Sequence, residues 1–141
     1  YHTANNREDM DFLIRELKRH RDKEGLLMAN FVDFDSMYGH RRNAQGYAQC
    51  LEDFDSMLGE LLPLLQDDEL LMITSDHGND PTMSGTDHTR EEVPLVAYSP
   101  SLTESTDLGT RLTFADLGQT IMDNFDAGKL PFGTSFLNDL K

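Results

Sequence analysis

The chain has 141 residues, 38% of them hydrophobic, and carries 26 acidic against 12 basic side chains, for a formal net charge of -14. This length and composition indicate one folded domain with its own core and argue against intrinsic disorder. The acidic excess argues against nucleic acid and anionic membranes as partners, because both attract basic surfaces. A phosphate substrate would therefore need bound cations to neutralise its charge.

The single cysteine, Cys50, excludes an internal disulfide framework and favours a reducing cytoplasm. We interpret it as a small apolar residue on a helix. No apolar run approaches the roughly 18 residues of a membrane span, and no signal peptide is visible. Because the chain begins at Tyr1 and not at an initiator Met, we expect it to be a piece of a longer protein.

The first part of the chain predicts a helix followed by a strand. Apolar residues at helical spacing indicate a helix over residues 7–23, which Gly25 ends. The mostly apolar run 26–34 then predicts a strand. Its two-residue alternation would place Asp33 and Asp35 on the same face.

The next predicted elements are a long helix and a buried strand. The helix covers residues 44–65, and Pro63 should kink or shorten its last turn. The short apolar run 70–73 is typical of a strand that is buried on both faces. The helix should contribute its apolar stripe to the core: Tyr47, Leu51, Phe54, Leu58, Leu61 and Leu65.

The last part of the chain predicts one more strand and one more helix. Residues 93–98 form the strand, with Pro94 tolerated near its start. Thr113 and Asp116 resemble a capping box that opens the helix, and Gly128 follows its end. Its buried stripe should comprise Phe114, Leu117, Ile121, Met122 and Phe125. Alternating helices and strands indicate an α/β fold, with a parallel or mixed sheet covered by helices on both faces.

The motif Asp76-His77-Gly78 follows the predicted strand 70–73 directly, where a strand ends and a loop begins. Open α/β sheets place their chemistry at such points. An adjacent Asp–His pair offers one carboxylate oxygen and one imidazole nitrogen, and Gly78 lets the backbone turn sharply around whatever they bind. The motif therefore predicts part of a metal site, with further ligands from elsewhere.

Two predicted loops carry both Asp and His residues. Their candidate metal ligands converge if the strands are neighbours, and they are Asp35, His40, Asp76, His77 and His88. His2 and His20 lie among charged residues near the chain start and a helix end, so we expect them on the solvated surface.

Three segments closely resemble the phosphopentomutases, a family of the alkaline phosphatase superfamily. They are residues 33–42, 76–82 and 85–94. The Asp-His-Gly element recurs across the superfamily and identifies no more than that. The family is indicated by the five-residue step from Asp35 to His40, the Tyr-Gly-His-Arg-Arg run and the Asn-Asp-Pro-Thr that follows Asp-His-Gly.

The resemblance implies a three-layer α/β/α sandwich with a mostly parallel central sheet, present here as a partial core. Residues 1–141 would be the C-terminal part of the metal-binding catalytic core, without the N-terminal core segment and the inserted cap domain. The resemblance also implies two Mn²⁺ ions. Asp35, His40 and His88 would hold the first, and Asp76 and His77 the second.

The family's nucleophile is a phosphorylated Thr that lies in the N-terminal part of those enzymes, so we expect no catalytic residue in this chain. The resemblance leaves Asp33, Asp80 and Asp87 as residues that orient ligands, and Thr82, Thr86 and Thr89 as hydrogen-bonding loop residues. Arg41 and Arg42 either add positive charge near the metals or form salt bridges on a loop.

For the complete protein the resemblance implies interconversion of ribose 1-phosphate and ribose 5-phosphate, and of the deoxyribose pair, through a phosphothreonine and a bisphosphate intermediate. The partners would be the sugar phosphate and the remaining N-terminal part, and this piece alone would be inactive. Two alternatives stay open. One is a cofactor-independent phosphoglycerate mutase or a metal phosphatase of the same superfamily, and the other is a non-catalytic metal-binding domain.

Overall fold

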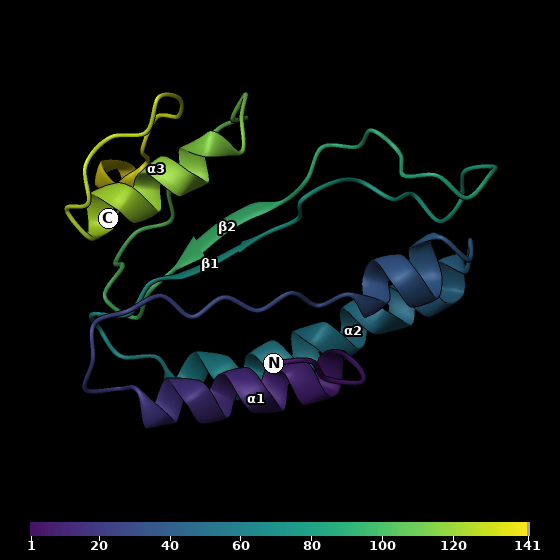
Figure 1. The fold of residues 1–141 in the computed structure, drawn as a ribbon, viewed down its shortest axis with the longest axis horizontal. Coiled ribbons are helices and arrows are strands. Elements are labelled where there is room, and N and C mark those ends of the chain that lie inside the picture. Colours follow the sequence, from purple (N-terminus) through teal and green to yellow (C-terminus); the bar gives the residue numbers. More distant parts are fainter. Residues whose placement is uncertain (141) are drawn as a thin grey trace. The chain divides into compact units, whose positions relative to one another are not determined.

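The computed structural model describes residues 1–140, which form two compact units (Figure 1). The first unit comprises residues 1–65 and 77–93, and the second comprises residues 66–76 and 94–140. Within residues 1–140, no helix has both the length and the apolar composition needed to cross a membrane.

Two helices dominate the first unit, and both were predicted. Helix α1 spans Asn6–Arg19 and begins at Asn5, whose side chain accepts a hydrogen bond from the Glu8 amide. Helix α2 spans Ala44–Leu61 and begins in the same way at Asn43. Pro63 lies in a short 3₁₀ turn, η2 (Leu62–Leu64), that ends α2 earlier than expected, because proline has no amide hydrogen to donate.

The core of the first unit lies where α1 and α2 pack together (Figure 1). Its buried side chains are Met10 from α1 and Cys50, Met57 and Leu61 from α2, which confirms Cys50 as a buried helical residue. The predicted stripe is confirmed at Leu61, which is buried, but not at Leu51, which remains 51% exposed. The residue next to it, Cys50, faces α1 instead, where its sulfur accepts a hydrogen bond from the Asn6 side chain.

The strand predicted over residues 26–34 is wrong. Residues 24–31 run without regular structure, and the chain then turns into a π-helix, η1 (Phe34–Gly39). Leu26 and Met28 stay 57% and 89% exposed. The apolar composition of this segment favours a strand, but a strand also needs a neighbour to pair with its backbone, and within residues 1–140 none pairs here.

Helix η1 is held against α2 by aromatic packing. The Phe34 ring lies 5.6 Å from Phe54 in an edge-on arrangement and 5.8 Å from Tyr47. Phe31 packs edge-on against Phe54 as well, at 5.0 Å. These rings fix the backbone immediately before Asp35.

The second unit contains a two-stranded antiparallel sheet of β1 (Leu71–Thr74) and β2 (Leu95–Tyr98). Both strands were predicted, but the mostly parallel sheet and its three-layer sandwich are not seen in residues 1–140. The connection explains the direction of pairing. Parallel neighbours need a crossover, usually a helix, whereas the segment between β1 and β2 contains no helix.

Helix α3 (Ala115–Asn124) begins close to the predicted Thr113, but it buries the opposite face from the one expected. Its buried residues are Asp116, Gln119 and Thr120, whereas Phe114 is 60% exposed. The polar face is buried because the following segment bonds to it. Asp116 Oδ1 accepts from the Thr134 amide at 2.9 Å, and Thr120 Oγ1 accepts from the Phe136 amide at 3.0 Å. A last 3₁₀ turn, η3, covers Leu137–Asp139.

Candidate metal centre

The π-helix η1 brings Asp35 and His40 to the same place. In an α-helix a five-residue step rotates the side chain by about 140°, which would send the two residues to different faces. Here the His40 amide donates to the Asp35 carbonyl at 2.9 Å, the five-residue bond of a π-turn, so His40 lies one turn beyond Asp35. The wider turn therefore aligns the two candidate ligands.

The third candidate ligand near Asp35 and His40 is His88, which lies in the loop 77–93. An isolated antiparallel bridge closes this loop, in which the Thr89 amide donates to the Gly78 carbonyl at 3.1 Å. A β-carbon at residue 78 would lie 2.9 Å from the Thr89 oxygen and 2.8 Å from the Glu91 nitrogen. Gly78 is therefore required by close backbone approach, and not by the sharp turn that the sequence suggested.

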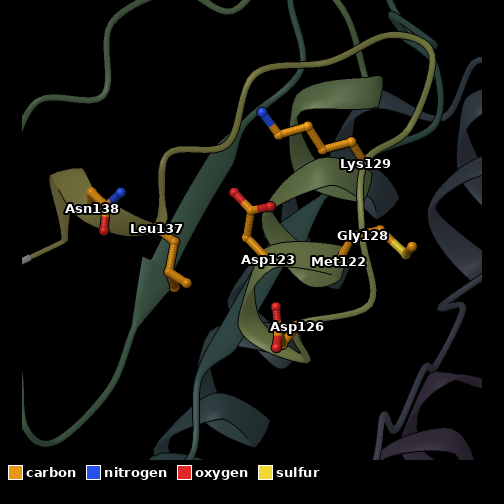
Figure 2. A pocket seen from close by; sticks show the side chains of 7 residues that line it. All are labelled: Met122, Asp123, Asp126, Gly128, Lys129, Leu137 and Asn138. Atoms are coloured by element: carbon orange, nitrogen blue, oxygen red, sulfur yellow. The ribbon is translucent and has the colours of Figure 1, made fainter.

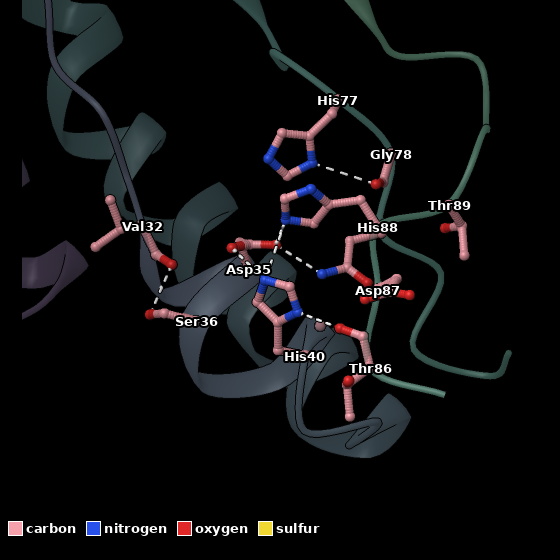
Figure 3. Close-up of polar contacts among 12 residues, drawn as sticks. Val32, Asp35, Ser36, His40, His77, Gly78, Thr86, Asp87, His88 and Thr89 are labelled. Carbon is pink, nitrogen blue, oxygen red and sulfur yellow. Dashed lines mark hydrogen bonds and ion pairs between the residues drawn. The ribbon is translucent and has the colours of Figure 1, made fainter. Parts of the chain in front are cut away.

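Asp35, His40 and His88 form a cluster whose candidate ligand atoms lie within 4.8 Å of one another (Figure 3). The two histidine Nε2 atoms are 3.0 Å apart. His40 Nε2 lies 3.3 Å from Asp35 Oδ2, and His88 Nε2 lies 3.4 Å from Asp35 Oδ1. The side chains are 35–46% exposed, so a solvated cation can reach them.

The protonation of His40 suits metal binding. Its Nδ1 lies 2.5 Å from the Thr86 carbonyl oxygen, which can only accept a hydrogen bond. Nδ1 must therefore carry the proton, and in the neutral ring Nε2 keeps its lone pair directed at His88 and Asp35. Figure 3 shows this ring between Thr86 and the cluster.

The spacing of the three side chains fits one cation. Protein ligands lie about 2.0–2.2 Å from a divalent ion, so neighbouring ligand atoms of one ion are about 3.0–3.5 Å apart. The separations of 3.0, 3.3 and 3.4 Å fall in this range when each histidine is paired with its nearer Asp35 oxygen, and with a single Asp35 oxygen all three ligand atoms lie within 4.8 Å of one another. A mixed carboxylate and imidazole set suits Mn, Fe or Zn.

Comparison with known families also indicates a metal-dependent protein. Residues 1–129 match the family described as the Metalloenzyme superfamily. The chain belongs to the Metalloenzyme superfamily. It is also 52% identical, over 141 residues, to a phosphopentomutase of Levilactobacillus brevis, a match that covers all of this chain and 35% of that protein. The chain thus spans about a third of the length of this curated relative.

The other two predicted ligands of this superfamily member are not in the cluster. Asp76 follows β1 in the second unit, and His77 begins the loop segment of the first. The His77 ring stacks on His88 with the ring centroids 3.7 Å apart (Figure 3). His77 thus lies beside the cluster, while Asp76 and His77 stay a prediction as ligands of a second metal.

The three aspartates expected to orient ligands each do something different. Asp33 Oδ2 accepts from the Asn6 amide at 2.9 Å, which ties the start of η1 to α1. Asp80 Oδ1 accepts from both the amide and the hydroxyl of Thr82 at 2.7 Å. Asp87 contributes its backbone carbonyl, which accepts from Arg42.

The hydrogen bonds from Thr82 lower the pKa of Asp80, because they stabilise its charged form. Thr89 also bonds within the loop, since its hydroxyl oxygen accepts from the Asp80 amide at 2.6 Å. Thr86 contributes through its carbonyl to His40. The three threonines thus act as the loop residues that the sequence indicated.

The sequence reasoning missed Asn79. Its side-chain nitrogen donates to Asp35 Oδ1 at 2.6 Å, and its oxygen accepts from Arg42 at 2.6 Å. Its place two residues after His77, within the Asn-Asp-Pro-Thr run, was the available signal. Arg42 therefore forms hydrogen bonds and not the salt bridge that was one of its two expected roles.

A separate hollow of about 370 Å³ lies in the second unit, beside α3 (Figure 2). Asp123, Asp126 and Lys129 provide its charged groups. The Asp123 carboxylate accepts a hydrogen bond from Gln119 at 2.6 Å. With two acids, one base and no imidazole in its lining, the hollow does not offer the ligand set of the cluster.

Proposed function

We propose that Asp35, His40 and His88 bind one divalent metal ion, Mn²⁺ by resemblance, in a phosphopentomutase. The observation that carries this proposal is the three-residue cluster, whose candidate ligand atoms lie within 4.8 Å of one another. The 52% identity to a phosphopentomutase over the whole chain supports the choice of reaction. The substrates would be ribose and deoxyribose phosphates, with a phosphoryl group moving between the 1- and 5-oxygens.

The residues of this chain would bind the metal ion and orient its ligands. His40 presents a lone pair because its other nitrogen donates to Thr86, and Asp35 supplies the negative charge that a cation needs. When bound, the metal would stabilise negative charge on the transferring phosphoryl oxygens. We assign the nucleophile to no residue here, because by resemblance it is a phosphothreonine elsewhere in the protein, which acts through a bisphosphate intermediate.

The remaining expectations belong to the same proposal. Asp76 and His77 would contribute to a second Mn²⁺. The chain would be the C-terminal part of a three-layer α/β/α core whose other strands complete the sheet. The free Cys50 thiol suits a cytoplasmic enzyme.

A turnover assay on the full-length protein that carries this chain tests the activity. With Mn²⁺ we expect conversion of ribose 1-phosphate to ribose 5-phosphate, and a fall of about 100-fold or more in His88→Ala. His20→Ala is the matched control, because His20 lies at the end of α1, outside the cluster. Turnover of phosphoglycerate with none of ribose 1-phosphate would reject the substrate, and activity in neither would favour a non-catalytic metal-binding domain.

A further inference from the structure

Arg42 connects the end of η1 to the loop that carries His88. Its Nε donates to the Gly85 carbonyl at 2.5 Å, and its Nη2 donates to the Asp87 carbonyl at 2.5 Å. Its Nη1 is shared among the Asn79 side-chain oxygen at 2.6 Å, the Asp80 carbonyl at 2.9 Å and the Gly39 carbonyl at 3.2 Å. A planar guanidinium suits this task, because its donors point in fixed directions.

The backbone of Arg42 is strained. Its φ of 52° lies in the left-handed region, which costs a residue with a β-carbon about 1–2 kcal/mol. Such a conformation persists only where the surroundings hold it. The hydrogen bonds of the guanidinium to the loop provide such a constraint.

Asn79 links Arg42 to Asp35, one of the three cluster residues. It is only 9% exposed, and its amide donates to Asp35 Oδ1 at 2.6 Å while its oxygen accepts from Arg42. Gly39 packs against it, since a β-carbon at residue 39 would lie 2.5 Å from Asn79 Nδ2. The amide is therefore fixed on both sides, and it in turn fixes the Asp35 carboxylate.

We propose that Arg42 and Asn79 are positioning residues that orient Asp35 and set the loop of His88, so that the three ligands are preassembled for a cation. Neither residue is itself a ligand in this role. The inference rests on the proposed metal site and deepens it. Residues that orient a ligand from outside the metal's own shell typically change metal affinity by about 10- to 100-fold.

The sign of the effect separates positioning from simple charge. A positive side chain near a bound cation repels it, so removing that charge alone would strengthen metal binding. Positioning predicts the opposite, because Asp35 and His88 become free to leave their places. Arg41 provides the matched control. It carries the same charge one residue earlier, is exposed, and donates at 3.3 Å to the Ser36 carbonyl.

The experiment is a calorimetric titration of the metal-free chain with Mn²⁺. We expect the dissociation constant to rise about 10- to 100-fold in Arg42→Ala and in Asn79→Ala. Arg42→Lys should not restore affinity, because an ammonium lacks the planar fork. Arg41→Ala should stay within about two-fold of the wild type. The electron paramagnetic resonance spectrum of bound Mn²⁺ should change in Asn79→Ala and not in Arg41→Ala.

Two further variants keep the test decisive if Arg42→Ala does not fold. Asn79→Ala keeps the Arg42 bonds to backbone carbonyls and removes the two side-chain bonds of Asn79, one from Arg42 and one to Asp35. Gly39→Ala displaces Asn79 while every hydrogen-bonding group remains, so it should also weaken Mn²⁺ binding. Gly59→Ala, on α2 with nothing within 4 Å of the added carbon, is its control.

The outcomes distinguish this inference from the proposed function. A wild-type chain that binds no Mn²⁺ would reject the metal site and this role with it. A wild-type chain that binds Mn²⁺, with Asn79→Ala and Gly39→Ala binding equally well, would reject the positioning role alone. Tighter Mn²⁺ binding by Arg42→Ala would show that Arg42 affects the metal through the repulsion of its positive charge and not by positioning the ligands.

Discussion

At the scale of single residues, the cluster predicts how the loss of one ligand affects metal binding. Asp35→Ala and His88→Ala each leave two protein ligands for an ion that needs about three together with water. We expect either change to weaken Mn²⁺ binding by at least about 10-fold, measured by calorimetry on the metal-free chain. Cys50→Ser should not affect binding, because Cys50 faces α1 and not the cluster.

Unchanged Mn²⁺ affinity in both ligand variants would contradict the assignment. A large loss in Cys50→Ser would mean that the packing of α1 on α2 controls the cluster. Far-ultraviolet circular dichroism of each variant separates these cases, because a change in helix content would accompany the second.

Asp80 predicts a pH dependence of stability. Its pKa is lowered by the Thr82 hydroxyl and amide, so ionised Asp80 contributes stability above the ordinary Asp pKa of 3.8. This contribution is lost as the pH falls through the lowered pKa of the folded state. Asp80→Asn keeps an accepting oxygen without the charge. We expect the thermal midpoint of the wild type to exceed that of the variant at about pH 7, and the gap to narrow as the pH falls to about 3, below the ordinary pKa of 3.8.

The effect should be small, because Asp80 is only half-buried and salt screens such interactions. A gap of the same size at both pH values would mean that the side-chain shape, and not its ionisation, stabilises the loop. The same titration with Thr82→Val should show a reduced gap, since the hydroxyl donor is then absent.

At the scale of elements, the packing of α1 on α2 predicts an unequal pair of methionine substitutions. Met10 is fully buried between these helices, whereas Met28 is 89% exposed in the irregular segment before η1. Met10→Ala should lower the free energy of unfolding by about 2–5 kcal/mol through lost contacts and a cavity. Met28→Ala should change it by less than about 0.5 kcal/mol. Equal losses in chemical denaturation would mean that residues 24–31 have a partner in solution.

The elements show what sequence patterns can and cannot determine. Helices α1 and α2 were predicted because their apolar spacing is a local signal. The exposure of Leu51 on α2 follows from two adjacent apolar residues, Cys50 and Leu51, either of which could face α1. The missing strand at residues 26–34 and the polar inner face of α3 depend on which distant segment packs there, and no local pattern records that.

For the candidate metal centre, the residues could be predicted from the sequence, but the backbone geometry that brings them together could not. Asp35, His40 and His88 were identified from residue type and resemblance, and the structure brings them together. The prediction that Asp35 lies at the end of a strand was wrong. Asp35 lies in a π-turn instead, and π-turns have no clear sequence signature. Asn79 was missed, since an amide that supports a carboxylate resembles any other loop amide.

At the scale of the whole molecule, the acidic excess and the cluster have a common consequence. A net charge of -14 raises the local concentration of cations around the chain, and this attraction weakens as salt screens it. Divalent metal can then do two things at once. It would satisfy the clustered ligands and reduce repulsion among carboxylates, so the metal-free chain should be the less stable form.

The division into two units predicts where Mn²⁺ stabilises the chain. All three cluster residues belong to the first unit, so metal at about 100 times its dissociation constant should stabilise that unit by about 2.7 kcal/mol. Hydrogen exchange should then slow about 100-fold at the His40 and Thr89 amides, which bond to Asp35 and Gly78. The Phe136 amide in the second unit should be unaffected. If it slows equally, the two units open as one cooperative body, and metal bound by the first stabilises the entire chain.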